Sequence, residues 1–472
     1  MRVIVFALNG CPAGWLGAYG NDWVGTPNLD RLASEGVTFD RHISDRPEPH
    51  AARRAWFGGP GKKPTPPPPL PEGKGEESQH TPITFDFAQE ASPKFTPFPS
   101  GTGVGGLGSF ARTVLVRANH PDTDAPPSYY AGWGEVFDAR PRPDDDSPLN
   151  ELLRTFPALL DRLADVPDFL LWVETDRLIP PWDVQQDVFE AYLDEGEDEE
   201  PADEHAGDDE AEEPDAEEID EGDEGSADDE AEEPDAESPE PPVPEEPVPP
   251  FADPPTGPFD RSDPDAWDYL HRTFAAVVTK LDAELGRLFE DLRARGLDRS
   301  AAWLVTSDFG HPLGEHGQIG LHRPWLHEEL VHLPLILRLP DAEQGGRRVA
   351  GFTQPPDVYP TLLALVGAAP PAGTNGFNLL PLARGEAPAS RTFAVTALEL
   401  GGAAEAAIRT DEWALLVPVR VPDGDAPRDP LLFEKPDDRW EVNDLRARNI
   451  ERADELEAKL RHEMQETGPA AQ

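Results

Sequence analysis

Cysteine, basic residues and long apolar runs are scarce in this chain of 472 residues. The single cysteine, Cys11, excludes an intramolecular disulfide framework and a multi-cysteine metal site. No apolar run approaches the roughly 18 residues that a membrane-spanning helix needs. The opening apolar run, residues 3–8, is too short for the core of an export signal. These features predict a cytoplasmic protein without a membrane anchor.

Charge of one sign dominates, because 93 Asp and Glu stand against 40 Lys and Arg, for a net charge of -53. Such a charge repels phosphate backbones and anionic lipids, so neither nucleic acid nor a membrane is an expected partner. Residues 194–246 hold 30 of the acidic residues and no Lys or Arg, which leaves 63 acidic against 40 basic residues, or -23, elsewhere. The sequence DDEAEEPDAE occurs there twice, starting at Asp208 and at Asp228. This segment is expected to be disordered, and its candidate partners are cations or a basic protein.

Short apolar runs alternate with helical patterns in the rest of the chain. The pattern predicts strands at residues 3–8, 113–117, 169–173, 302–306 and 333–339. It predicts helices at residues 26–37, 149–163, 266–296 and 357–365, with a kink or break at Pro157 and a C-cap at Gly367. Alternation of this kind favours an α/β fold with a central, mostly parallel sheet and helices on both faces.

Composition divides the chain into four parts. Residues 1–193 form the first part of the α/β domain and include a Pro/Gly-rich loop at 60–108. Residues 194–250 are the acidic, low-complexity insertion, and residues 251–390 complete the α/β domain. Residues 391–472 are predicted to form a small C-terminal subdomain.

Several separate motifs follow one another in a recognisable order. They are TPNLDRLASEGVTF from Thr26, VVTKLDAELGRLFEDL from Val277, VTSDFGHPLGEHG from Val305, HEELVHLPLILRLP from His327, QPPDVYPTLLALVG from Gln354 and LLFEKPDDRWEVNDL from Leu431. In these motifs the chain resembles the sulfatase family of the alkaline phosphatase superfamily. The resemblance implies the α/β fold, hydrolysis of sulfuric esters and a divalent cation, usually calcium.

The resemblance also implies metal ligands that this chain lacks. Two adjacent aspartates are expected after the first strand, and Asp followed by Asn or His after a later strand. The matching positions hold Asn9 and Gly10, then Asp308 and Phe309. Calcium takes six to eight oxygen ligands, so Asn9 and Asp308 are at most a vestigial metal site, and calcium is expected to bind weakly or not at all. The residues alone also favour a simple strand-end turn at Asn9-Gly10.

The family's nucleophile is missing as well. Its Cys or Ser, four positions before a matching Arg, aligns with Pro49, and proline has no nucleophilic atom. Cys11 lacks the sequence context in which the family matures its nucleophile, and we expect a small residue buried at a strand end. No catalytic residue is therefore assigned.

An anion-binding role remains open for the basic residues. Pro49 suits the first turn of a helix, which would place Arg53 on the same side as the free N–H groups. His322 or Arg323, near a position where the resemblance implies a substrate-contacting Lys, could join Arg53 in holding sulfate, phosphate or a carboxylate. Arg53 is equally compatible with a structural salt bridge. His316 is as compatible with bracing its glycine-rich loop as with touching a ligand.

The sequence thus predicts a sulfatase-fold protein with a degenerate active site. It would lack metal-dependent hydrolysis and act as an anion-binding or interaction module. The alternative is an active sulfuric or phosphoric ester hydrolase with a centre remodelled around Asn9, Asp308, His311 or His322. A third hypothesis makes the acidic insertion the functional part. If the first two hypotheses hold, Asn9, Asp308 and Arg53 should meet at the carboxyl ends of neighbouring strands.

Overall fold

The computed structural model describes residues 1–57, 110, 112–118, 133–140, 149–194, 248–422, 426 and 428–466. The loop predicted at 60–108 and almost all of the acidic insertion predicted at 194–250 lie outside these residues. None of the helices within the described ranges is long and apolar enough to cross a membrane.

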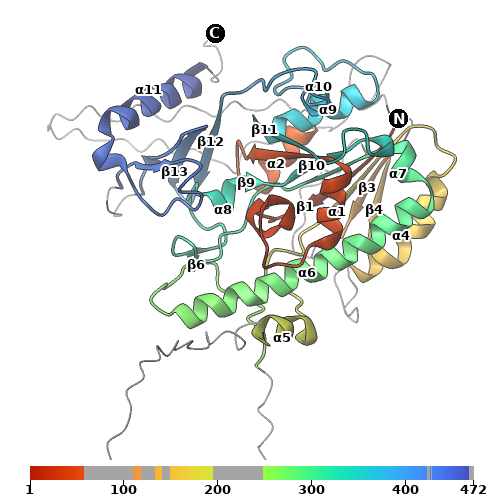
Figure 1. The fold of residues 1–472 in the computed structure, drawn as a ribbon, viewed down its shortest axis with the longest axis horizontal. Helices are drawn as coiled ribbons and strands as arrows, with labels where there is room; N and C mark the ends of the chain where they lie inside the picture. The colour runs from red at the N-terminus through yellow and green to blue at the C-terminus, as the bar shows by residue number, and fades with distance from the viewer. Residues whose placement is uncertain are drawn as a thin grey trace, which may run out of the picture.

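A nine-stranded sheet forms the centre of the molecule, in the order β11-β2-β10-β7-β1-β5-β3-β4, with β9 paired to β2 (Figure 1). Its strands are β1 Arg2–Leu8, β2 Val37–Ile43, β3 Arg112–Arg117, β4 Glu135–Asp138, β5 Phe169–Thr175, β7 Ala301–Thr306, β9 His332–Leu333, β10 Leu335–Arg338 and β11 Arg347–Thr353. Strands β7, β1, β5, β3 and β4 run parallel to one another, whereas β10 is antiparallel to both of its neighbours. The mostly parallel sheet predicted from the sequence is confirmed.

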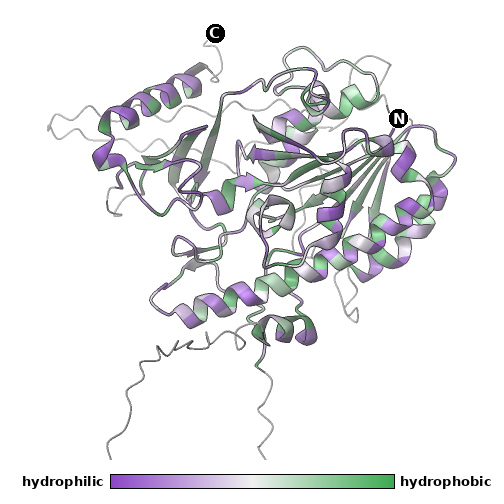
Figure 2. Cartoon of the chain, viewed as in Figure 1, coloured by the Kyte–Doolittle hydropathy of each residue, from purple (hydrophilic) through white to green (hydrophobic). Residues whose placement is uncertain are grey.

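Helices cover both faces of this sheet (Figure 1). They are α1 Pro27–Glu35, α2 Pro49–Trp56, α4 Asn150–Leu163, α5 Gln186–Asp194, α6 Pro264–Ala294, α7 Leu297–Ser300, α8 Glu328–Val331, α9 Val358–Leu365 and α10 Leu380–Ala383. Side chains of α1, α4, α5 and α6 share one core cluster, and side chains of α2, α9 and α10 share another. The central strands are green along most of their length in Figure 2, as expected for strands covered on both sides.

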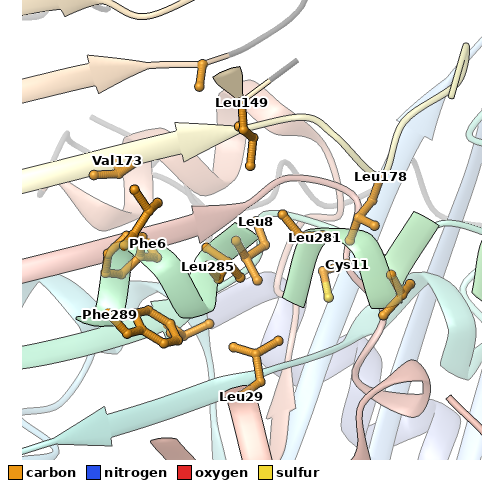
Figure 3. Packing of buried hydrophobic residues seen from close by; sticks show 14 of the residues in the cluster. Phe6, Leu8, Cys11, Leu29, Leu149, Val173, Leu178, Leu281, Leu285 and Phe289 are labelled. Atoms are coloured by element: carbon orange, nitrogen blue, oxygen red, sulfur yellow. The ribbon is translucent and has the colours of Figure 1, made fainter. Parts of the chain in front are cut away.

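The first strand shows why this architecture follows from the sequence. Residues of β1 alternate between the two core clusters, with Ile4, Phe6 and Leu8 in one and Val3 and Val5 in the other. A strand buried on both faces has no solvent side, so its sequence is a continuous apolar run. Figure 3 shows Phe6 and Leu8 packed beside Leu281, Leu285 and Phe289 of α6.

A second, antiparallel sheet makes up the C-terminal subdomain. Its strands, in order, are β12 Phe393–Leu400, β13 Ala403–Thr410, β14 Trp413–Arg420 and β15 Leu431–Glu434. Helix α11 Ile450–Glu466 packs on one face through Ala453, Leu456 and Leu460. A short pair of strands, β6 Gly257–Pro258 and β8 Gln318–Ile319, stands apart from both sheets.

Three local predictions need correction. Val37 begins strand β2 instead of continuing the first helix, which ends at Glu35. The strand predicted at 333–339 is divided into β9 and β10 at Pro334, because proline has no N–H to donate to a ladder. Helix α4 runs through Pro157 without a break, since its apolar side packs into the core on both sides of that residue, at Leu152, Phe156, Leu159, Leu160 and Leu163.

Candidate active site

The polar residues predicted from the first strand and from β7 meet at one edge of the sheet. Strands β1 and β7 are parallel neighbours, with Ala7 beside Thr306, so the residues that follow them emerge together. Asn9 Nδ2 donates a hydrogen bond of 2.9 Å to Asp308 Oδ2. Both side chains are buried, and Asp308 is completely inaccessible. The predicted turn at Asn9-Gly10 is present, since the N–H of Cys11 donates to the carbonyl of Leu8 at 3.2 Å.

Asp308 is held by N–H donors of the chain itself. Besides the bond from Asn9, its Oδ1 accepts the backbone N–H groups of Gly10 at 3.1 Å and of Phe309 at 2.9 Å. Burial raises the pKa of Asp308 to about 6, although the charge of Arg53 and the two backbone hydrogen bonds act in the opposite direction. Asn9 Oδ1 is buried and has no hydrogen-bond partner among the described residues. The amide thus turns its donor toward the carboxylate.

Gly10 occupies a conformation that an aspartate would adopt only with strain. Its φ is +78°, in the left-handed region that favours glycine. A Cβ at this position would lie 2.9 Å from Cγ1 of Ile179. The space that the resemblance assigns to a second metal-binding carboxylate is therefore closed by the turn and by Ile179.

Arg53 comes to the same region but is paired with a carboxylate of the chain. Its Nη2 lies 3.2 Å from Glu174 Oε2, and both side chains are almost fully buried. Glu174 sits near the end of β5, next to β1, and its Oε1 accepts a 3.0 Å hydrogen bond from Trp172 Nε1. The charge of Arg53 also acts on Asp308. Asn9 and Asp308 thus meet at the carboxyl ends of β1 and β7, and Arg53 lies within electrostatic reach of Asp308.

The residue at the nucleophile position is the first residue of a helix. Pro49 begins α2, where the missing N–H of proline costs no intrahelical hydrogen bond. Cys11 is also unsuited to be a nucleophile, because it is fully buried in the apolar cluster of Figure 3. Burial and the charge of Asp308 raise the pKa of its thiol well above the usual range. Its prediction as a small buried residue is confirmed.

These residues do not fit a calcium ion. Calcium needs several oxygen ligands, and here the group facing Asp308 is an amide N–H. Phe309, at another expected ligand position, packs in an apolar cluster with Leu330, Leu416 and Phe433 between the two sheets. Across the ranges that the structure describes, no group of three or more His, Cys, Asp or Glu side chains is arranged to hold a metal ion.

The other basic candidates make contacts elsewhere. The guanidinium of Arg323 lies 4.3 Å from the ring centre of Trp325, and its charge acts on the buried Glu405 of β13. His322 is half-buried, and burial together with Arg323 lowers its pKa. His311 is buried against Phe274 and Trp182, and burial lowers its pKa to about 4. The contacts shown for these residues do not join them to Arg53.

His316 connects its glycine-rich loop to two other segments. Its Nδ1 lies 2.8 Å from Glu329 Oε1, and its Nε2 lies 3.2 Å from the carbonyl oxygen of Glu441. Its ring stacks on His327 with centroids 3.7 Å apart. These bonds brace the loop against α8 and the C-terminal subdomain.

Glu174 is the residue of this cluster that the sequence did not reveal. It directly follows the apolar run FLLWV, predicted as a strand at residues 169–173, and is the penultimate residue of β5. A carboxylate at the end of a buried strand requires a partner, because an unpaired buried charge is very costly. This is the signal by which Glu174 could have been found, although the sequence does not say that the partner is Arg53.

Parts of this sequence are similar to known proteins. The sulfatase family model matches residues 226–368. An N-acetylglucosamine-6-O-sulfatase of Bacteroides thetaiotaomicron is 32% identical over 123 residues, which are 26% of this chain and 22% of that protein. The multifunctional alkaline phosphatase superfamily protein PehA of Trinickia caryophylli is 34% identical over 124 residues, which are 25% of this chain and 23% of that protein. These curated relatives are thus matched over less than a quarter of their own length.

The similarity of fold extends over the whole chain. The phosphonate monoester hydrolase of Agrobacterium radiobacter superposes with a TM-score of 0.62 at 16% identity, covering 99% of this chain and 96% of that one. The chain therefore shares its overall fold with this phosphonate monoester hydrolase. In sequence, residues 226–368 of this chain are similar to the sulfatase family.

Proposed function

We propose that this sulfatase-like protein does not hydrolyse sulfuric esters by a metal-dependent mechanism and serves as a binding or interaction module. The observation that carries the proposal is the hydrogen bonding of Asp308. Its two oxygens accept from Asn9 Nδ2 and from the N–H groups of Gly10 and Phe309. A carboxylate surrounded by donors is a structural hydrogen-bond centre, whereas a hard cation would need further oxygens around it.

The missing nucleophile supports the same proposal. Pro49 offers no oxygen or sulfur at the start of α2, and Cys11 is buried with a raised thiol pKa. A metal-activated water could replace a protein nucleophile only where a metal is held. Asn9 and Asp308 together bring one carboxylate and one amide, and that amide presents its N–H. Both routes to hydrolysis therefore lack a necessary group.

The test is an assay of the full chain with aryl sulfates and aryl phosphates across a panel of divalent cations. We expect no turnover above a buffer control. Asp308→Ala and the surface variant Asp265→Ala form a matched pair, since Asp265 is exposed in the first turn of α6. Turnover that Asp308→Ala abolishes and Asp265→Ala retains would overturn the proposal in favour of a remodelled hydrolase.

Anion binding at Arg53 is the narrower form of the proposal. Arg53 brings a buried positive charge to the sheet edge, but Glu174 already lies 3.2 Å from it. Sulfate or phosphate would have to compete with this carboxylate. If sulfate binds at Arg53, added sulfate should stabilise the folded protein. The stabilisation should be larger in Glu174→Gln, because the amide removes the competing negative charge. Sulfate stabilisation that is identical in the two proteins would contradict a site at Arg53.

Interaction through the acidic insertion rests on composition alone, because residues 195–247 lie outside the described part of the chain. Its carboxylates would attract cations or a basic protein. Deletion of residues 194–250 tests this role. Binding of a basic partner protein that is unchanged by the deletion would exclude it.

A further inference from the structure

A cavity of about 450 Å³ lies between the β6–β8 pair and the C-terminal sheet. Its volume is within the range of small-molecule sites. Figure 1 shows β6 between the beginning of α6 and the C-terminal strands. Its lining residues come from the segment between β6 and α6, from residues 316–327 and from the C-terminal subdomain: Phe259, Arg261, His316, Gly317, Trp325, His327, Leu431, Phe433, Glu441, Val442 and Asp444. The cavity shares no lining residue with the cluster of Asn9, Arg53 and Asp308.

Two stacked histidines line this cavity, and His316 contributes a positive charge to it. The rings of His316 and His327 are 3.7 Å apart and inclined by only 14°. Both ring nitrogens of His316 face acceptors, the Glu329 carboxylate and the Glu441 carbonyl, so both must carry a proton. Burial lowers the pKa of His316, but Glu329 outweighs it and the net pKa is about 9. His316 is therefore an imidazolium at neutral pH.

Aromatic and aliphatic side chains surround the histidines. Phe433 is buried, whereas Phe259, Trp325 and Leu431 are partly exposed. Val442 stands at the rim with 70% of its surface accessible. Flat apolar walls of this kind suit a planar ring, which can stack on aromatic side chains.

Most carboxylate oxygens that line the cavity already accept hydrogen bonds from the chain. Glu441 Oε1 lies 2.9 Å from Arg409 Nη2 and 3.2 Å from Lys435 Nζ, and its Oε2 lies 3.0 Å from His327 Nδ1. Asp444 Oδ1 accepts two backbone N–H groups. Thus both carboxylate oxygens of Glu441 and one of Asp444 are already engaged by the chain.

N–H groups of Arg261 remain available to a ligand at the rim of the cavity. Arg261 is exposed, and one of its five N–H groups is used on the carbonyl of Glu315, at 2.5 Å. A ligand that complements this lining should therefore bring acceptors and negative charge to Arg261, with a ring against the apolar walls.

We propose that this cavity binds a small aromatic carboxylate, with its ring against Phe259 and its carboxylate on Arg261. This proposal names a class of ligand for the binding module proposed above, and it therefore rests on that proposed function. It is tested without a hydrolysis assay, so the two can fail separately. Turnover at Asp308 would overturn the proposed function and leave this cavity untouched.

The experiment is calorimetric titration of the full chain with 2-naphthoate and, as a neutral isostere, with 2-naphthamide. We expect the carboxylate to bind and the amide to bind about tenfold more weakly, as a charge-assisted bond to Arg261 predicts. Arg261→Gln should weaken naphthoate by a similar factor. Arg287→Gln is the matched control, because Arg287 is an exposed arginine on α6 outside the cavity.

A second variant separates the cavity from other sites. Val442→Trp should block the rim and abolish naphthoate binding without touching the buried lining. The proposal is overturned if naphthoate does not bind, if the amide binds equally well, or if Arg261→Gln and Val442→Trp bind like the unchanged protein.

Discussion

At the scale of single residues, the carboxyl group of Asp308 is the most informative atom group in the molecule. It is fully buried, and its strongest contacts are N–H donors from Asn9, Gly10 and Phe309. Burial raises its pKa to about 6, so the folded protein holds this proton more tightly than the unfolded chain. Stability attributable to this group is therefore highest at low pH and falls as the pH rises from about 4 through about 6.

Asp308→Asn should remove this dependence on pH. The side chain of Asn9 can rotate its amide so that Oδ1, which has no partner among the described residues, accepts from the new amide. We expect the variant to gain about 1–3 kcal/mol in free energy of unfolding near pH 7 relative to the unchanged protein, and to gain little below about pH 4. Urea unfolding across this range measures the difference. A difference that does not vary with pH, or a loss of stability at neutral pH, contradicts the account.

At the scale of residues, the sequence alone identified several positions of the candidate site. Asn9, Gly10, Pro49 and Phe309 could each be recognised as departures because they stand inside motifs of known order. Their new contacts could not be predicted. Ile179 limits the space for a side chain at position 10, and Glu174 is the ion-pair partner of Arg53. Both contacts join segments that are far apart in sequence.

At the scale of elements, helix α2 and strand β5 are joined by the buried pair of Arg53 and Glu174. The sequence left Arg53 open between an anion site and a salt bridge, and the structure shows the salt bridge. Most elements were predictable because a strand buried on both faces or an amphipathic helix leaves a clear pattern. Strand β2 was missed because its sequence, VTFDRHI, mixes apolar with charged residues and follows directly on α1. Its place in the sheet depends on pairing with β10 and β11, which are distant in the chain.

A double-mutant cycle on Arg53→Met and Glu174→Gln measures the link between α2 and β5. Each single change should lower the free energy of unfolding by about 3–5 kcal/mol, since it removes one member of a buried ion pair. The double variant should lose less than the sum by at least about 1 kcal/mol. The exposed pair Arg452 and Glu455 on α11 is the control, with an expected coupling of about 0–1 kcal/mol. Coupling at Arg53 no larger than in the control would show that the buried pair does not join the elements.

At the scale of the whole molecule, the central sheet and the C-terminal sheet are joined by polar as well as apolar contacts. Phe309 and Phe433 belong to one apolar cluster that spans the two sheets. Beside it, His316 reaches Glu329 of α8 and the backbone of Glu441. The junction therefore depends on a protonated histidine.

His316→Gln should weaken this junction in a way that depends on pH. Because the pKa of His316 is raised to about 9, its contribution is complete below about pH 6.5 and is lost as the pH rises through about 9. We expect the variant to be less stable by about 1–3 kcal/mol near pH 7 and to approach the unchanged protein above that range. Denaturant unfolding of both proteins measures this difference. It includes the effect of the His316 charge on nearby Glu315, whose own pKa burial raises to about 8. His462→Gln, on exposed α11, should show no such trend; an equal trend in both variants would contradict the assignment.

The central claim is that the Asp308 cluster is a structural hydrogen-bond centre and not a cation site. The most direct test is thermal unfolding of the full chain and of Asp308→Asn, each measured with and without added calcium. Calcium held by carboxylates elsewhere, including those of residues 194–246, would act equally on both proteins, so only the difference reports on Asp308. We predict the same calcium-induced change in melting temperature for the two proteins. Stabilisation by calcium that is present in the unchanged chain and lost in Asp308→Asn would contradict the account.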